Sequence, residues 1–218
     1  MNESASTLES DRASEPVFTS DWFESARPVW ELFIPALDAT RVLEVGSYEG
    51  ASACYLISAL GVKAPLEMHC VDTWEGSAEF KGTGIDMREV EARFHRNTRL
   101  CVERSPFPVT LEIHKDHSDI CLAKLLVEKQ KGYFDLVYID GSHQACDVLS
   151  DAVLGFQLLR CHGIMVFDDY LWHEGPEGSK NPAQCPKMAI DAFINCNFHK
   201  VRVISAPLHQ IYLQKLSD

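Results

Sequence analysis

The 218-residue sequence has no C-x-x-C pair, no long apolar run and comparatively few basic residues. Its eight cysteines are scattered and mostly neighbour apolar residues, which favours reduced core thiols over structural disulfides or a zinc site. The longest apolar stretch, near residues 53–60, is too short to cross a bilayer, and residues 1–16 lack the basic start and apolar run of a signal peptide. We therefore expect a cytoplasmic protein without a membrane partner.

The charge balance is acidic, with 32 Asp and Glu residues against 20 Lys and Arg and a formal net charge of -12. Such a chain repels a phosphate backbone, so we expect no nucleic-acid partner. The length and a hydrophobic content of 46% suit one globular domain, which we assign to residues 18–218. Residues 1–17 are rich in Ser and Glu with almost nothing to bury, which predicts a disordered tail. The sequence leaves the oligomeric state open, a homo-oligomer included.

A helical segment is predicted directly after this tail. Apolar residues between Trp22 and Leu37 recur at spacings of three and four, which is typical of amphipathic helices. Asp21 is a suitable N-cap, and Pro28 and Pro35 are expected to break the pattern into one or two helices. The domain therefore begins with a helical preface.

Short apolar runs and helical patterns alternate through most of the remaining chain. Strands are predicted over 41–45, 66–71, 109–113, 134–139 and 164–167, and helices over 51–60, 87–100, 119–129, 144–160 and 186–195. Strict alternation predicts right-handed crossovers and a parallel sheet covered on both faces. Two last strands, 200–204 and 209–213, are separated only by a turn at Pro207. The fold class is therefore α/β, a doubly wound, Rossmann-like, seven-stranded, mostly parallel sheet with an antiparallel C-terminal hairpin.

The segment Arg41-Val-Leu-Glu-Val-Gly-Ser-Tyr-Glu-Gly50 runs from a predicted strand into a predicted helix, where doubly wound sheets bind nucleosides. A dinucleotide fingerprint requires a glycine where Tyr48 stands, and Glu49 would place a carboxylate against the phosphates. S-adenosylmethionine (SAM) has no phosphate and carries an ammonium and a sulfonium group, so an acid such as Glu44 becomes favourable. The loop favours SAM over NAD, and an ordinary strand-to-helix turn is the alternative.

The pattern E-x-G-x-x-x-G after a strand resembles the first motif of class I SAM-dependent methyltransferases, which also end in an antiparallel hairpin. The resemblance implies that the cofactor site contains Glu44, Gly46, Ser47, Tyr48, Gly50, Asp72, Asp116, His117, Ser118 and Asp140. In this scheme Asp72 binds the ribose hydroxyls, although its spacing fits a nicotinamide enzyme equally. The adenine lies against residues 116–118, where relatives usually have a glycine in place of Asp116.

Three carboxylates follow two strands that we expect to be neighbours. Asp140 follows the strand 134–139, and Asp168 and Asp169 follow the strand 164–167. Because paired strands lie about 4.8 Å apart, the three side chains should converge at one edge of the cofactor crevice. Oxygen ligands without a nearby cysteine suit Mg²⁺ better than zinc. The alternative is that Asp140 caps the following helix and one of the Asp pair faces solvent.

The stretch from Asp140-Gly-Ser-His143 to Phe167-Asp-Asp-Tyr170 is similar to a group of small-molecule O-methyltransferases that includes macrocin O-methyltransferase and, more distantly, catechol O-methyltransferase. The similarity covers roughly residues 18–215 and implies metal ligands at Asp140, Asp168 and Asp169. It departs at His162, which replaces a glycine before the fifth strand and is tolerable because histidine is enriched at positive φ. It departs again at Ser142, where macrocin-type enzymes carry an acid proposed as general base.

His143 stands where the catechol enzyme carries its lysine base. A histidine, with an ordinary pKa of about 6.5, can accept a proton at neutral pH, whereas a serine cannot do so unaided. His143 is therefore the candidate catalytic base. The alternative is a histidine at a helix N-terminus that hydrogen-bonds a carboxylate or the adenine side.

The predicted function is a SAM- and Mg²⁺-dependent O-methyltransferase that acts on a hydroxyl of a small-molecule acceptor, such as a natural-product or sugar intermediate. Two alternatives are a metal enzyme of the same scaffold with other chemistry, in the group that contains cephalosporin hydroxylases, and a noncatalytic SAM-binding module. The Gly- and Pro-rich segment 171–181 directly follows the predicted metal ligands and predicts a lid over the acceptor.

Overall fold

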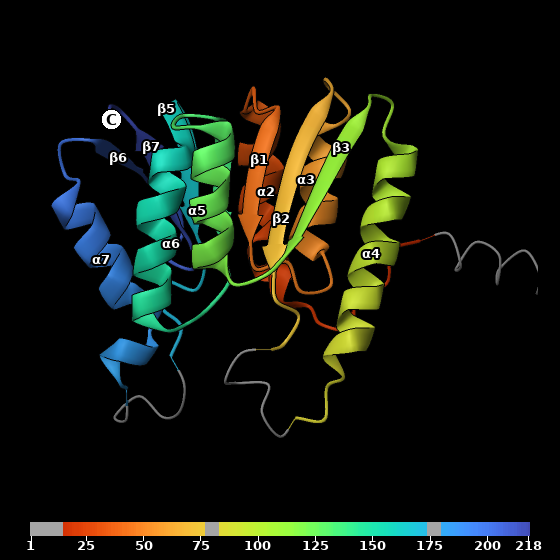
Figure 1. The fold of residues 1–218 in the computed structure, drawn as a ribbon, viewed down its shortest axis with the longest axis horizontal. Coiled ribbons are helices and arrows are strands. Elements are labelled where there is room, and N and C mark those ends of the chain that lie inside the picture. Colours follow the sequence, from red (N-terminus) through yellow and green to blue (C-terminus); the bar gives the residue numbers. More distant parts are fainter. Residues whose placement is uncertain (1–14, 77–82, 174–179) are drawn as a thin grey trace, which may run out of the picture.

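The computed structural model describes residues 15–76, 83–173 and 180–218, which contain a single seven-stranded sheet (Figure 1). The strands are β1 (Arg41–Val45), β2 (Leu66–Asp72), β3 (Val109–Lys115), β4 (Phe134–Ile139), β5 (Leu159–Phe167), β6 (Val201–Ile204) and β7 (Ile211–Lys215). Their order is β3-β2-β1-β4-β5-β7-β6, and only the pairs of β7 with β5 and β6 are antiparallel. The predicted α/β fold with its antiparallel C-terminal hairpin is confirmed.

Helices cover both faces of this sheet. The α-helices are α2 (Arg27–Phe33), α3 (Ala51–Leu60), α4 (Met87–Arg104), α5 (Ser118–Lys129), α6 (Ala145–Leu158) and α7 (Pro186–Cys196), and the short 3-10 helices are η1 (Trp22–Ser25), η2 (Ile34–Ala36) and η5 (Pro182–Gln184). Figure 1 shows α5, α6 and α7 in front of the sheet and α2 and α3 behind it. The buried core divides in the same way, with α5, α6 and α7 in one apolar cluster and α2, α3 and α4 in the other.

The N-terminal preface differs from its prediction in detail. Pro28 lies in the first turn of α2 and does not break it, because a first-turn residue needs no N–H partner within the helix. Asp21 precedes η1, but its side chain makes no capping hydrogen bond. Glu15 and Val17 already have partners on α4, so the predicted boundary at residue 18 is too late. Residues 1–14 of the predicted tail lie outside the described residues.

The fifth strand begins at Leu159, five residues before the predicted start at 164, because Leu159 already pairs with Phe134 across a register shift. His162 adopts a φ of 64°, which confirms the expectation that this histidine takes over the conformation of a glycine. All eight cysteines are described as free thiols, and five of them are buried. Within the described ranges, no helix has the length and apolar character that crossing a membrane requires.

Candidate functional site

The ends of three central strands bring the predicted site residues to one edge of the sheet. The Asp140 N–H donates to Val45 O at 2.7 Å, and the Asp168 N–H donates to Ile139 O at 3.0 Å. These bonds extend the ladders of β1 with β4 and of β4 with β5 by one residue. The glycine loop (residues 46–50), Asp140 and Asp168 therefore lie side by side, as the strand pattern predicts.

The glycine loop contains left-handed backbone, which glycine adopts far more readily than other residues. Gly46, Tyr48 and Gly50 have φ values of 85°, 47° and 81°. Asp72 fixes this shape from β2, because its Oδ2 accepts the N–H groups of Ser47 and Tyr48, both at 2.9 Å. Its Oδ1 accepts the N–H of Trp74 at 2.8 Å. Asp72 thus has fewer lone pairs available for a ribose than the resemblance implies, and it also shapes the loop.

Gly46 approaches the end of β4 more closely than any side chain permits. A Cβ at this position would lie 2.0 Å from the carbonyl oxygen of Asp140, whereas a Cβ at Gly84, with a similar φ of 79°, would meet nothing within 4 Å. We expect Gly84→Ala to lower the free energy of unfolding by about 1–2 kcal/mol, the usual cost of left-handed backbone. Gly46→Ala adds a clash with the backbone of Asp140 and should lower the free energy of unfolding by more than about 4 kcal/mol. Losses of this size are exceptional for a single substitution.

Urea unfolding of the two alanine variants measures this difference. If Gly46→Ala and Gly84→Ala lower the free energy of unfolding equally, β1 and β4 can move apart at the loop without a loss of stability. That result would contradict the close contact between Gly46 and Asp140.

The expectation that Glu44 favours the charged groups of the cofactor needs correction. Glu44 is fully buried, and its two carboxylate oxygens accept the hydroxyls of Ser47 and Ser52, both at 2.6 Å. Burial raises its pKa to about 7 despite these hydrogen bonds. With no exposed surface, Glu44 supports the loop from inside and makes no direct contact with a ligand in this conformation.

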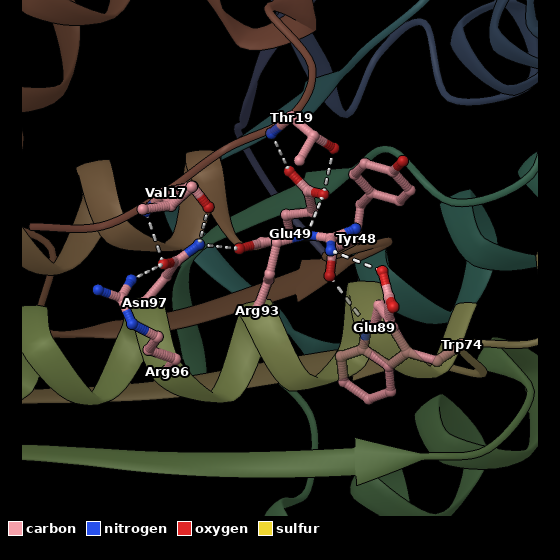
Figure 2. A network of polar contacts seen from close by, with 9 residues as sticks. All are labelled: Val17, Thr19, Tyr48, Glu49, Trp74, Glu89, Arg93, Arg96 and Asn97. Carbon is pink, nitrogen blue, oxygen red and sulfur yellow. Dashed lines mark hydrogen bonds and ion pairs between the residues drawn. The ribbon is translucent and has the colours of Figure 1, made fainter. Parts of the chain in front are cut away.

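Glu49 also differs from its expected role. Its carboxylate lies beside Thr19, where Oε1 accepts Nε of Arg93 from α4 at 2.6 Å, and only 1% of the residue is exposed (Figure 2). The argument that Glu49 would repel phosphates is therefore wrong, because the charge is paired and faces away from the loop. Tyr48 remains where a dinucleotide site needs glycine, and its carbonyl accepts Trp74 Nε1 at 2.9 Å.

The loop that by resemblance frames adenine lies beside Asp72. The register pairs Asp72 with Lys115, so residues 116–118 follow directly at the same edge. Asp116 is engaged locally, since Oδ1 accepts the His117 N–H at 2.9 Å and Oδ2 accepts Lys124 Nζ at 3.0 Å. His117 is the exposed N-cap residue of α5, and Ser118 is the first residue of this helix. The structure therefore places these residues near the glycine loop, with the Asp116 carboxylate turned to α5.

The three predicted metal ligands form one cluster. Asp140, Asp168 and Asp169 each offer a carboxylate oxygen, and these oxygens lie within 4.8 Å of one another. Burial and the neighbouring acids raise the pKa of Asp140 well above its ordinary value, and the same causes raise the pKa of Asp168. Asp140 does not cap α6, because Gln144 holds the N-cap position and Asp140 Oδ2 accepts the Tyr138 hydroxyl at 2.9 Å.

Tyr138 and Gln210 hold this cluster from behind. The Tyr138 hydroxyl also contacts Asp168 Oδ2, which in addition accepts Gln210 Nε2 at 2.7 Å. Gln210 Oε1 accepts Trp30 Nε1 at 2.8 Å, so the orientation of the amide is fixed. The sequence could have indicated Tyr138, because a residue two positions before Asp140 in a strand lies on the same side of the sheet. Gln210 follows the hairpin turn, and no sequence pattern indicated its contact with Asp168.

His143 lies against the cluster as well. Its Nε2 is 2.8 Å from Asp169 Oδ2, and its ring stacks on the Trp172 ring with centroids 3.8 Å apart. The contact with Asp169 is the one expected if His143 only hydrogen-bonds a carboxylate. The same geometry also places the imidazole at the predicted metal site, as a catalytic base requires. Trp172 belongs to the predicted lid 171–181, of which residues 174–179 lie outside the described residues.

Comparisons with known proteins match the part of the chain that contains this site. A family model described as a methyltransferase domain matches residues 43–170, which include the glycine loop, Asp72 and the carboxylate cluster. The O-methyltransferase from Bacillus cereus in complex with SAH (S-adenosylhomocysteine) has a TM-score of 0.57 and 15% sequence identity over 99% of this chain and 90% of that one. The O-methyltransferase TomG from Streptomyces achromogenes, in complex with SAM, has a TM-score of 0.56 and 15% identity over the whole of both chains.

Curated protein sequences give no match to this chain. The solved structures above therefore show a shared fold, while the family model, which spans more than half of the sequence, carries the assignment. With the glycine loop and the acidic cluster inside the matched range, the chain belongs to the methyltransferase domain family.

Proposed function

We propose that this protein is a SAM-dependent O-methyltransferase that acts in the cytoplasm on a hydroxyl group of a small molecule held at a Mg²⁺ ion. One observation carries the proposal, the convergence of three carboxylates beside the glycine loop of a methyltransferase domain. The SAM and SAH complexes of the structural neighbours support the choice of cofactor.

The residues of the cluster fit a hard divalent cation. Mg²⁺ binds oxygen ligands at 2.0–2.1 Å, so ligands on opposite sides of one ion are roughly 4 Å apart. Separations within 4.8 Å bring the three aspartates within reach of one ion after small side-chain rotations. When bound, such an ion would orient an acceptor hydroxyl and lower its pKa. Asp140, Asp168 and Asp169 would hold it, and Tyr138 and Gln210 would keep Asp168 in place.

His143 is the proposed proton acceptor. Asp169 fixes the Nε2 edge of its ring, and Trp172 covers one ring face. In the proposed reaction the acceptor oxygen forms a bond to the methyl carbon of SAM while the bond from that carbon to sulfur breaks. The hydroxyl proton goes to His143, and the products are the methyl ether and SAH. The loop residues around Gly46 and Gly50, together with Asp72, would orient the methyl donor for in-line transfer.

Isothermal titration is expected to show binding of SAM and SAH and none of NAD. Asp72→Ala removes the acceptor of two N–H groups of the glycine loop and of the Trp74 N–H, and losing even one hydrogen bond to a charged group costs about 1.5–3 kcal/mol. We therefore expect the Kd for SAH to rise at least about tenfold. Glu75→Gln, at an exposed acid three residues further on, is the matched control and should bind as the wild type. Tighter binding of NAD than of SAM would overturn the cofactor assignment.

A further inference from the structure

A short N-terminal strap (residues 15–19) crosses α4 and ends on the glycine loop. Figure 2 shows two of its residues, Val17 and Thr19, beside Asn97 and Glu49. At its far end Glu15 forms an exposed ion pair with Arg104, at 2.9 Å. The strap thus connects the surface of α4 with the loop that we assign to the cofactor.

Asn97, fully buried on α4, joins the strap and the loop through one side chain. Its Oδ1 accepts the Val17 N–H at 2.9 Å, and its Nδ2 donates to Val17 O at 2.8 Å. The same Nδ2 donates to Glu49 O at 3.0 Å. Asn97 therefore holds the backbone of the strap in the manner of a neighbouring strand, and it also holds one carbonyl of the loop.

Glu49 makes the second connection. Its Oε2 accepts the Thr19 N–H, and its Oε1 accepts the Thr19 hydroxyl and Arg93 Nε, all at 2.6 Å. A buried carboxylate is tolerated only when its charge is paired and its lone pairs are used, and Arg93 and Thr19 meet both conditions. Removing the Thr19 donors leaves the Glu49 charge partly unsatisfied, so the strap and the conformation of the loop depend on each other.

The loop needs such support because its backbone is unfavourable. Tyr48 adopts a φ of 47° without being glycine, and left-handed backbone outside glycine persists only where the surroundings hold it. Asp72 and Trp74 hold the groups around Tyr48, and Asn97 and the strap hold those of Glu49. A loop that is already ordered loses less entropy when a ligand binds.

We propose that Glu49 and Asn97 are positioning residues for cofactor binding, which fasten the N-terminal strap and thereby keep the glycine loop in its binding-ready conformation. The proposal rests on the assignment of this loop to SAM. Neither side chain needs to touch the cofactor, because both act through the backbone of residues 48–50.

Thr19→Pro is the main test, because it removes the N–H and the hydroxyl that Glu49 accepts, at an exposed residue outside the core. SAH is the probe in isothermal titration. We expect Thr19→Pro and Asn97→Ala to raise the Kd for SAH about tenfold, with a similar rise in KM for SAM and little change in kcat. Thr19→Ser retains both donors and should bind as the wild type. Glu15→Gln, which breaks only the exposed pair with Arg104, should change the Kd less than about twofold.

Amide hydrogen exchange of the ligand-free protein separates this proposal from the cofactor assignment. Exchange in residues 47–50 should become at least about tenfold faster in Thr19→Pro, while the midpoint of thermal unfolding should fall by no more than about 5 °C. Unchanged exchange and unchanged SAH affinity in Thr19→Pro would overturn the role of the strap. Failure of the wild-type protein to bind SAH would instead overturn the assignment of the loop to SAM, even if the exchange rates respond to the strap.

Discussion

Replacing Asp140 or Asp169 by asparagine is expected to lower the affinity for a divalent cation at least about 100-fold. Mutating a residue that only hydrogen-bonds to a metal ligand already lowers metal affinity about 10–100-fold. Loss of a ligand carboxylate itself should lower the affinity at least as much. Asparagine keeps the size of the side chain and removes only the charge. Mn²⁺ is a convenient probe, and its binding is measured by isothermal titration or by electron paramagnetic resonance of the free ion, without an acceptor.

Glu103→Gln is the matched control, because it removes one exposed carboxylate of α4 away from the cluster. This variant should bind Mn²⁺ as the wild type does. Chelation by EDTA should likewise abolish methyl transfer, leave SAH binding nearly intact and be reversed by Mg²⁺. If the wild type, Asp140→Asn and Asp169→Asn bind Mn²⁺ equally, the cluster does not hold the metal and the proposal of a metal-dependent enzyme fails.

The same variants provide a second readout in the metal-free protein. Because the pKa of Asp140 is raised, the folded protein holds more protons than the unfolded chain above the ordinary carboxyl pKa of about 3.9. Asp140 by itself therefore makes the free energy of unfolding fall as the pH rises from about 4 towards neutrality, whereas acids with a lowered pKa, such as Glu67, act in the opposite direction. Asp140→Asn removes one of the repelling charges, so this fall should be smaller, with a gain of about 0.5–2 kcal/mol at pH 7. Urea unfolding at several pH values measures both effects.

The fold and the acidic cluster could be predicted because they depend on local patterns. Apolar runs define the strands, and a residue that directly follows a parallel strand lies at the carboxyl edge of the sheet. Asp140 and Asp168 each follow a strand directly, and β4 and β5 are neighbours, so the three carboxylates had to converge. The left-handed backbone of His162, which lies within β5, was expected from the family resemblance instead, because similar proteins have a glycine at this position.

The direction of the side chains in the glycine loop could not be predicted, because it depends on partners that are distant in sequence. Whether Glu49 faces a ligand or α4 is decided by Arg93 and by Thr19 of the strap, and no local pattern links these residues. The contact of Gln210 with Asp168 likewise arises from the pairing of β7 with β5. The boundary of the N-terminal segment was placed too late for the same reason, since the partner of Val17 is a buried asparagine on α4.

His143→Ala is expected to lower the rate of methyl transfer by about 10²–10⁴, the usual contribution of a positioned general base. His143→Gln separates this role from the alternative, in which the histidine only orients Asp169. The Nε2 of glutamine can occupy nearly the place of the histidine Nε2 and can still donate to Asp169 Oδ2, but an amide does not accept a proton. The rate is measured as SAH release, with an acceptor found by screening hydroxylated small molecules.

A general base and an orienting residue give different results in these two variants. If His143 accepts the proton, Gln and Ala should lose similar activity, part of it should return at high pH, and His143→Gln should bind Mn²⁺ as the wild type does. If His143 only holds Asp169, His143→Gln should retain its rate while His143→Ala loses affinity for Mn²⁺. Activity equal to the wild type in His143→Gln would therefore contradict the proposed proton transfer and leave deprotonation of the acceptor to the metal ion alone.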